Sequence, residues 1–164
     1  MTITIRREAL TSPPARALIA ALNAELSEMY PEPGATHFRL DPEEVSEGRG
    51  AFLVAYDGDA PVGCGALRLI DPRTGELKRM YVAPPLRSAG IGRRLVDALE
   101  AEALRLGAAH LVLETGSRQL AALALYQRAG FVAIPAYGEY VGSPTSICLG
   151  KGLGPAMERR ETAR

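Results

Sequence analysis

The N-terminal part of the chain contains two hydrophobic patterns with different periods. Residues 2–7 alternate β-branched and polar side chains, which is typical of a short strand. Ser12 is followed by two prolines and marks a helix start, because serine caps a helix and proline fits its first turn. Apolar residues then recur at helical spacing, at Leu18, Ile19, Leu22 and Leu26. We therefore predict a strand and then a helix that ends near Tyr30.

Three apolar runs in the middle of the chain predict consecutive antiparallel strands. An irregular, acidic stretch over residues 32–50 precedes them, and within it Asp41 can cap a short helical turn. The first two runs are separated by Asp57-Gly58-Asp59, which favours a hairpin. The predicted strands cover residues 51–56, 61–70 and 76–82.

After residue 90 the pattern alternates between helices and strands. Ile91, Leu95 and Leu99 recur at four-residue steps and predict a helix over residues 91–106, which Gly107 ends. The remaining predicted elements are a buried strand over 110–114, a helix over 119–129 and closing strands over 131–134 and 146–149.

These elements predict a mixed α/β fold. A strand, a helix and a second strand in succession favour parallel pairing between residues 76–82 and 110–114. We expect a twisted mixed sheet of about seven strands, flanked by about four helices. The 164 residues suit one domain, which we place at residues 1–153. Residues 154–164 are polar without periodicity, and we expect a flexible tail there.

Composition and charge exclude several classes of protein. The 19 basic residues balance 19 acidic ones, so the overall charge indicates neither a nucleic-acid nor a membrane partner. No apolar run approaches ~20 residues, and the N-terminus lacks the pattern of a signal peptide. The two cysteines, Cys64 and Cys148, lack metal-ligand spacing. We therefore expect a cytoplasmic protein with reduced thiols and no metal.

Residues 80–94 carry the strongest functional signal. A hydrophobic strand runs into two prolines, a loop with Gly90 and Gly92 follows, and a long amphipathic helix begins. Glycine lets the backbone approach a ligand closely, and the unpaired N–H groups of a helix start attract anions. From Arg68 to Arg94, seven basic side chains stand against two acidic ones, a net of +5. These features predict that the loop binds a small polyanion through a phosphate group.

Two motifs in this half of the chain resemble a known family. Arg87-Ser-Ala-Gly-Ile-Gly92 resembles the R/Q-x-x-G-x-G/A acyl-CoA loop of the GNAT superfamily of N-acyltransferases. Residues 122–131, ALALYQRAGF, resemble its A-x-x-L-Y-x-x-x-G-F segment at every fixed position. The predicted order of elements agrees with the superfamily over nearly the whole chain. This resemblance implies acetyl-CoA as the acyl donor and a sheet that splays between its fourth and fifth strands.

The resemblance also implies which residues contact the donor. The pantetheine arm would pair with backbone groups of the fourth strand, at Met80, Tyr81 and Val82. The diphosphate would rest on the loop and helix start, formed by Arg87, Ser88, Ala89, Gly90, Ile91, Gly92 and Arg93. Family members commonly have Asn seven residues before the motif tyrosine, where this chain has Gln119.

Two residues are catalytic candidates. An amine with a pKa of ~10 is mostly protonated at neutral pH, so acyl transfer benefits from a base. The resemblance implies Glu76 as this base, although a strand-edge glutamate can equally pair with Lys78 or a neighbouring arginine. It implies Tyr126 as the general acid for the thiolate, where a helical tyrosine could otherwise serve packing alone. Both cysteines lie in apolar strand patterns, which favours direct transfer over a thiol intermediate.

The acceptor site is less well defined by the sequence. The resemblance implies a pocket formed by the first helix, the loop after it, the far end of the fourth strand and the last hairpin. The candidates are Tyr30, His37, Arg39, Tyr137 and Tyr140. The tyrosine-rich residues 135–144 suit a pocket wall but could equally cover a homodimer contact. The acidic residues 41–47 favour a cationic acceptor, or form a solvated face.

We therefore predict an N-acetyltransferase that moves an acetyl group from acetyl-CoA directly to a primary amine of a small molecule, amino acid or peptide. Acceptors at protein N-termini or lysines, or on an aminoglycoside-type antibiotic, are alternatives within the same chemistry. A non-catalytic regulatory module that binds acetyl-CoA is an alternative outside it. A plain nucleotide-binding fold is disfavoured, because the loop lacks the G-x-x-x-x-G-K-[S/T] lysine and hydroxyl.

Overall fold

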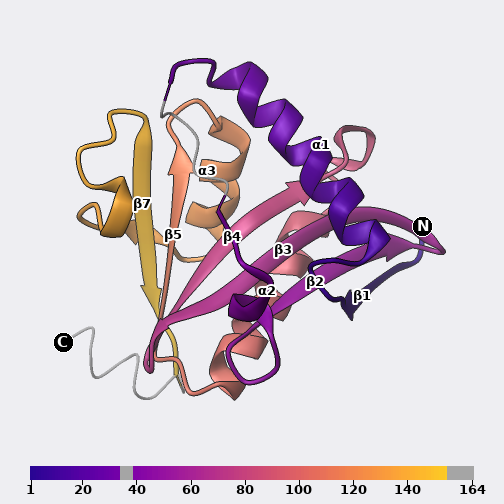
Figure 1. The fold of residues 1–164 in the computed structure, drawn as a ribbon, viewed down its shortest axis with the longest axis horizontal. Coiled ribbons are helices and arrows are strands. Elements are labelled where there is room, and N and C mark those ends of the chain that lie inside the picture. Colours follow the sequence, from indigo (N-terminus) through magenta and orange to yellow (C-terminus); the bar gives the residue numbers. More distant parts are fainter. Residues whose placement is uncertain (34–38, 155–164) are drawn as a thin grey trace.

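Seven strands of the described chain join one twisted sheet in the order β1-β2-β3-β4-β5-β7-β6 (Figure 1). The computed structural model describes residues 1–33 and 39–154. The strands are β1 (Ile3–Arg7), β2 (Gly50–Asp57), β3 (Ala60–Asp71), β4 (Thr74–Val82), β5 (His110–Gly116), β6 (Val132–Ala133) and β7 (Ser146–Gly152). Only β4 and β5 pair in parallel among these strands, which confirms the predicted mixed sheet. Apart from Gly154, the predicted tail lies outside the described residues.

Three α-helices occur in the described residues, where we expected about four flanking helices. They are α1 (Pro13–Met29), α2 (Ile91–Arg105) and α3 (Leu120–Arg128). The turn expected after Asp41 is the short 3-10 helix η1 (Pro42–Val45), and two more such turns are η2 (Pro84–Leu86) and η3 (Gly138–Tyr140). The Ser12 hydroxyl caps α1 by accepting a hydrogen bond from the Ala15 N–H at 3.2 Å, as the sequence predicts. None of the described helices combines the length and the apolar character that crossing a membrane requires.

Helices cover both faces of the central strands. Helices α1 and η1 pack on one face of the sheet, and α2 packs on the other with α3 beside it (Figure 1). Successive residues of β2 alternate between the two cores, because side chains along a strand point to opposite faces. Phe52 and Val54 pack toward α1, whereas Leu53 and Ala55 pack toward α2. This double burial explains the unbroken apolar run of β2.

The sheet divides where β4 and β5 part. Their pairing runs from Thr74–His110 to Leu77–Leu113 and then stops, although both strands continue. β4 stays paired with β3 as far as Val82, and β5 stays paired with β7 as far as Gly116. The two halves of the sheet therefore diverge beyond Leu77, and the expected splay is confirmed.

An irregularity in β4 changes the faces on which its side chains lie. Cys64 pairs with Tyr81 and Ala66 with Lys78, so Arg79 and Met80 together oppose one residue of β3. Such a bulge re-aims side chains, and Arg79 adopts a left-handed φ of 57°. Its guanidinium donates a hydrogen bond to Asn23 of α1, whereas Met80 packs into the core under α2. Consecutive residues Lys78 and Arg79 thereby reach the same side of the sheet.

Candidate active site

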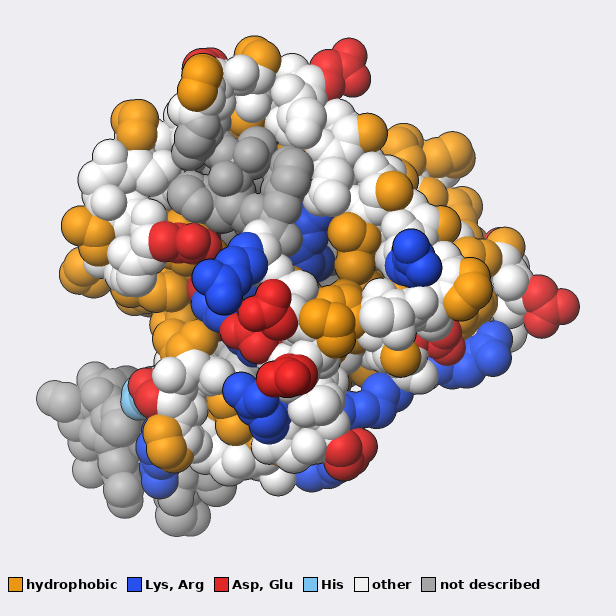
Figure 2. Space-filling model, in the orientation of Figure 1, with side chains coloured by type: hydrophobic (Ala, Val, Ile, Leu, Met, Phe, Trp, Pro, Cys, Tyr) orange, Lys and Arg blue, Asp and Glu red, His pale blue; other side chains and the backbone are white. Residues whose placement is uncertain are grey.

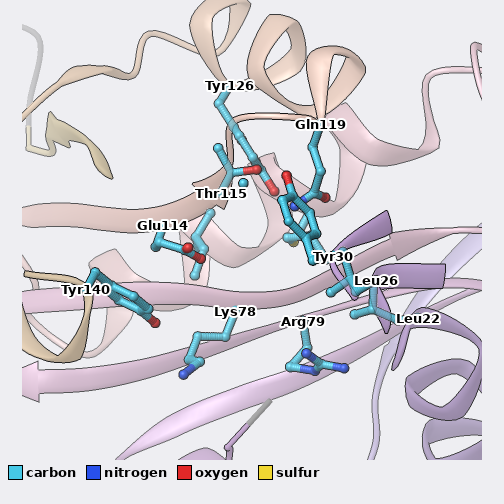
Figure 3. A pocket seen from close by; sticks show the side chains of 13 residues that line it. Leu22, Leu26, Tyr30, Lys78, Arg79, Glu114, Thr115, Gln119, Tyr126 and Tyr140 are labelled. Carbon is cyan, nitrogen blue, oxygen red and sulfur yellow. The ribbon is translucent and has the colours of Figure 1, made fainter. Parts of the chain in front are cut away.

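A cleft opens where the two halves of the sheet diverge (Figure 3). Its free volume is about 700 Å³, part of it open to solvent. Its walls come from α1, β4, the end of β5, α3 and the loop before β7. The lining residues are Leu22, Leu26, Tyr30, Leu77, Lys78, Arg79, Met80, Glu114, Thr115, Gly116, Gln119, Tyr126 and Tyr140. The cleft thus brings together residues that are far apart in the sequence. Some were predicted to bind the acyl donor, others to bind the acceptor amine, and one to act in catalysis.

The predicted anion-binding loop lies at the start of α2. Gly90 caps the helix with a left-handed φ of 84°, a conformation that favours glycine. The first intrahelical hydrogen bond runs from the Arg94 N–H to the Gly90 carbonyl at 3.2 Å. The amides of Ile91, Gly92 and Arg93 therefore precede the helical ladder, and their N–H groups are suited to an anion.

The arginine side chains of this loop are held by protein partners. The Arg93 side chain donates to Asp97 at 3.1 Å and to the Arg128 carbonyl at 3.2 Å, so its guanidinium is engaged within the protein. Arg94 donates to the Ile3 carbonyl. Arg87 pairs with Glu25 of α1 at 2.8 Å.

The positive charge that the sequence concentrates between residues 68 and 94 is divided in space. Arg68 and Lys78 lie on the α1 side of the sheet, where Figure 2 shows basic and acidic side chains close together. Arg87, Arg93 and Arg94 lie around the helix start instead. The seven basic residues therefore do not form one cluster around the loop, because β3 and β4 direct Arg68 and Lys78 to the α1 face of the sheet.

Tyr126 enters the cleft from α3 (Figure 3). Its ring packs edge-to-face on Phe131, with 5.9 Å between ring centroids. Burial, together with the negative charge of Glu114, raises the pKa of Tyr126 above its ordinary value. The hydroxyl is therefore protonated at neutral pH and can donate to a group in the cleft.

Glu76 is fully buried and held by two partners. Its Oε1 accepts a hydrogen bond from Arg68 Nε at 2.7 Å, and its Oε2 accepts one from the Tyr137 hydroxyl at 2.5 Å. Arg68 also pairs with Glu44 of η1. Glu76 is not among the residues that line the cleft. The ion pair with a neighbouring arginine, left open by the sequence, is therefore present.

Three charged cleft residues, Glu114, Lys78 and Arg79, were missed by the sequence analysis. Glu114 of β5 lies one residue beyond the last β4–β5 pair and accepts a hydrogen bond from Ser146 Oγ at 2.6 Å. Lys78 of β4 follows Glu76 on the same side of the strand, and burial lowers its pKa. Their position in the sequence could have indicated them. They follow the point where the fourth and fifth strands were expected to diverge, and side chains beyond that point can line the cleft.

The predicted acceptor residues separate into different environments. Tyr30 and Tyr140 line the cleft, and both are buried. The Tyr30 hydroxyl accepts a hydrogen bond from the Arg118 N–H at 2.8 Å and packs so closely on Gly116 that no Cβ would fit there. The Tyr137 ring contacts the Tyr140 ring edge-to-face, and the Tyr137 hydroxyl donates a hydrogen bond to Glu76.

Two other acceptor candidates do not join the cleft as described. Arg39 is exposed and pairs with Asp41 at 3.4 Å, and His37 lies outside the described residues. The acidic stretch expected to favour a cationic acceptor is engaged elsewhere. Its Glu44 pairs with Arg68, and its Glu47 pairs with Arg7 at 3.6 Å.

Cysteine and metal chemistry find no support in the described part of the chain. Cys64 and Cys148 are free and buried. Burial raises the pKa of the Cys64 thiol to about 12, so the reactive thiolate is scarce at neutral pH. No group of three or more His, Cys, Asp or Glu side chains that could hold a metal ion occurs among these residues.

The chain is similar to known proteins over most of its length. Residues 15–131 match the model of the acetyltransferase (GNAT) family. A protein of Azospirillum brasilense named IAA acetyltransferase is 36% identical over 152 residues, which cover 92% of this chain and 98% of that protein. An uncharacterized N-acetyltransferase of Bacillus subtilis is 30% identical over 141 residues, which cover 84% of this chain and 93% of that protein.

Solved structures share the fold. A Klebsiella pneumoniae protein described as a candidate acyl-CoA N-acyltransferase superposes with a TM-score of 0.79 at 34% identity, covering 93% of this chain and 99% of that one. A GNAT acetyltransferase of Elizabethkingia anophelis, solved with acetyl-CoA bound, superposes with a TM-score of 0.65 at 22% identity, covering 92% and 98%.

Proposed function

Because the chain belongs to the acetyltransferase (GNAT) family, we propose that it moves an acetyl group from acetyl-CoA directly to a primary amine of a small molecule, amino acid or peptide. The observation that carries this proposal is the cleft between β4 and β5, with Tyr126 inside it and the open helix start of α2 beside it. We assign the reaction to residues 1–153 as one catalytic unit. The two free cysteines fit a reducing compartment, and we place the reaction in the cytoplasm.

The residues present suit acetyl-CoA. The amides of Ile91, Gly92 and Arg93 can hold the diphosphate, and the carbonyls and amides of β4 beyond Leu77 have no ladder partner on the β5 side. The loop residues Ser88 and Gly90 both have left-handed φ, which makes the backbone concave there. Acetyl-CoA supplies a thioester carbonyl, which an amine nitrogen can attack.

Tyr126 is proposed to protonate the departing sulfur. As the carbon–nitrogen bond forms and the carbon–sulfur bond breaks, the sulfur takes the bonding electron pair and needs a proton. The buried hydroxyl of Tyr126 keeps its proton at neutral pH and lies in the cleft. The tyrosinate left behind is then reprotonated from solvent.

A carboxylate is proposed to accept the proton that the amine loses. Glu76 is the base that the family resemblance implies, yet both of its oxygens are engaged by Arg68 and Tyr137. Glu114 lines the cleft on the β5 side, and its charge acts on Tyr126. The geometry therefore favours Glu114 for direct contact with the amine, and Glu76 for holding the loop of Tyr137.

Release of free thiol from acetyl-CoA, measured over amino acids, polyamines, peptides and aminoglycosides, tests the proposal. Acetylation of at least one amine, with the product identified by mass spectrometry, is the expected result. Binding of acetyl-CoA by calorimetry without transfer to any amine of the panel would instead favour the regulatory module.

A further inference from the structure

The cleft contains a buried lysine whose carboxylate neighbours either stand at the limit of ion-pair distance or are shared with an arginine. The side chain of Lys78 is 5% exposed, and its ion pair within the described residues is with Glu139, at 3.9 Å from Nζ. Glu139 belongs to the η3 turn, and its side chain is 49% exposed, so water screens much of its charge. Burying an ammonium costs several kcal/mol unless it is paired and hydrogen-bonded. The charges of Glu76 and Glu44 also attract Lys78, but Arg68 pairs with both carboxylates and repels the ammonium, so Lys78 keeps charge available to a ligand.

The bulge in β4 adds a second cation beside the first. Without it, strand alternation would direct Arg79 toward α2, away from Lys78. The left-handed backbone of Arg79, with φ of 57°, is strained for a residue other than glycine. Both Lys78 and Arg79 line the cleft, and Figure 3 shows their side chains on the same side of it. The strained backbone thus concentrates positive charge at one wall of the cleft.

Arg68, which lies on the same side of the sheet, is already neutralised. Arg68 pairs with Glu44 and with Glu76, and neither carboxylate lines the cleft. The charged residues that do line it are Lys78 and Arg79 on β4 and Glu114 on β5. The cleft is therefore cationic at its β4 wall and anionic at its β5 wall.

We propose that the acceptor is an amine that also carries a carboxylate, which Lys78 binds while the amine lies toward Glu114 and Tyr126. This inference rests on the proposed acetyl transfer and deepens it. A carboxylate accepts short hydrogen bonds from an ammonium, and such charge-assisted bonds are about twice as strong as neutral ones. The amino group of the same molecule is directed to the β5 wall, where the negative charge of Glu114 attracts its protonated form. Amino acids, and peptides short enough to place their carboxylate at Lys78, have both groups.

The test uses matched acceptors and matched variants. The acceptors are amino acids, the corresponding amino acid amides and the corresponding decarboxylated amines. The variants are Lys78→Met, which keeps the length of the side chain without its charge, and Arg39→Met, which removes an exposed cation outside the cleft. The wild type should prefer the acid over its amide in kcat/KM by about 10- to 100-fold. Lys78→Met should abolish that preference mainly through KM, whereas Arg39→Met should retain it.

Binding provides a second measurement that does not depend on turnover. With CoA present, a carboxylated amine should raise the melting temperature of the wild type and of Arg39→Met, but not of Lys78→Met. If Lys78→Met fails to fold, the ratio of kcat/KM for the acid to kcat/KM for the amide in the wild type tests the inference. Equal kcat/KM values for acid and amide, or a preference for polyamines, would overturn the inference. If no amine is acetylated, the proposed function fails, and equal binding of acid and amide would then also remove the role of Lys78.

Discussion

The hydroxyl of Tyr137 donates a hydrogen bond at 2.5 Å to Oε2 of Glu76, a carboxylate whose other oxygen is bound by Arg68. This contact joins the loop before β7 to β4, across the divergence of the sheet. Burial, followed by the charge of Glu76, raises the pKa of Tyr137, so its hydroxyl remains a donor. The wall of the cleft that carries Tyr140 therefore depends on a carboxylate outside the cleft.

Removal of either partner of Glu76 should destabilise the protein, and removal of Arg68 should do so more than removal of the Tyr137 hydroxyl. Tyr137→Phe leaves one carboxylate oxygen without its donor, and we expect a loss of about 1–3 kcal/mol in the free energy of unfolding. Arg68→Met leaves a buried charge without its ion pair, and we expect about 3–5 kcal/mol. Urea unfolding of both variants measures the two losses. An equal, negligible loss in both would show that the network contributes nothing to stability.

The two carboxylates should differ in their effect on the pH dependence of the rate. Glu114→Gln should lower kcat/KM by about 10²–10⁴-fold, the usual contribution of a general base, and should remove the loss of rate toward acid pH. Glu76→Gln is the matched variant, and it should mainly lower stability. The two variants are compared by measuring kcat/KM against pH at a temperature where both are folded. A normal profile for Glu114→Gln with a flattened one for Glu76→Gln would assign the base to Glu76.

Tyr126→Phe should affect turnover without affecting the binding of acetyl-CoA. The substitution removes one hydroxyl and keeps the ring that packs on Phe131, so we expect kcat to fall about 10²-fold or more. Tyr30→Phe serves as the control, because it removes another hydroxyl from the wall of the cleft. Initial rates and calorimetry with acetyl-CoA separate the two effects. An unchanged kcat for Tyr126→Phe would leave the residue with a packing role alone.

Glu25 should compete with the acyl donor for Arg87. The ion pair between them is partly exposed, and such pairs contribute up to about 1 kcal/mol. Glu25→Gln releases the guanidinium, and we expect it to lower the Kd for CoA about two- to fivefold. Glu28→Gln, one turn along the exposed side of α1, removes the same charge without this contact. Calorimetry measures both, and an equal change in the two variants would attribute the effect to net charge.

Stability should fall at alkaline pH. Burial raises the pKa of the Cys64 thiol to about 12 from an ordinary value of 9.0, so the folded state favours the neutral thiol. This contribution is complete below pH 9 and is lost between pH 9 and 12, by about 1.4 kcal/mol per pH unit. The raised pKa values of Tyr126, Tyr137 and Tyr140 act in the same direction above pH 10. Urea unfolding from pH 7 to pH 11 measures the decline, which should be shallower in Cys64→Ala; the same slope in both proteins would contradict the role of this thiol.

Local signals predicted much of the framework and of the donor site. The cap at Ser12, the four-residue stripe of α2 and the left-handed glycine before it are properties of neighbouring residues, and the structure contains all three. The parallel pairing of β4 with β5 followed from the helix between them. The catalytic roles expected for Glu76 and Tyr126 came from the family resemblance, because composition and spacing alone left each with a structural alternative.

The sequence by itself determined most of the elements, the glycine loop that opens α2 and the family. Only the tertiary structure decided how the charges are distributed: Arg68 bound to Glu76, Lys78 and Arg79 on one wall, and Glu114 on the other. Secondary structure and capping depend on residues a few positions apart. The partner of a charge depends on strand register, on a bulge and on which segments pack above it, and these are set by contacts between residues that are distant in the chain.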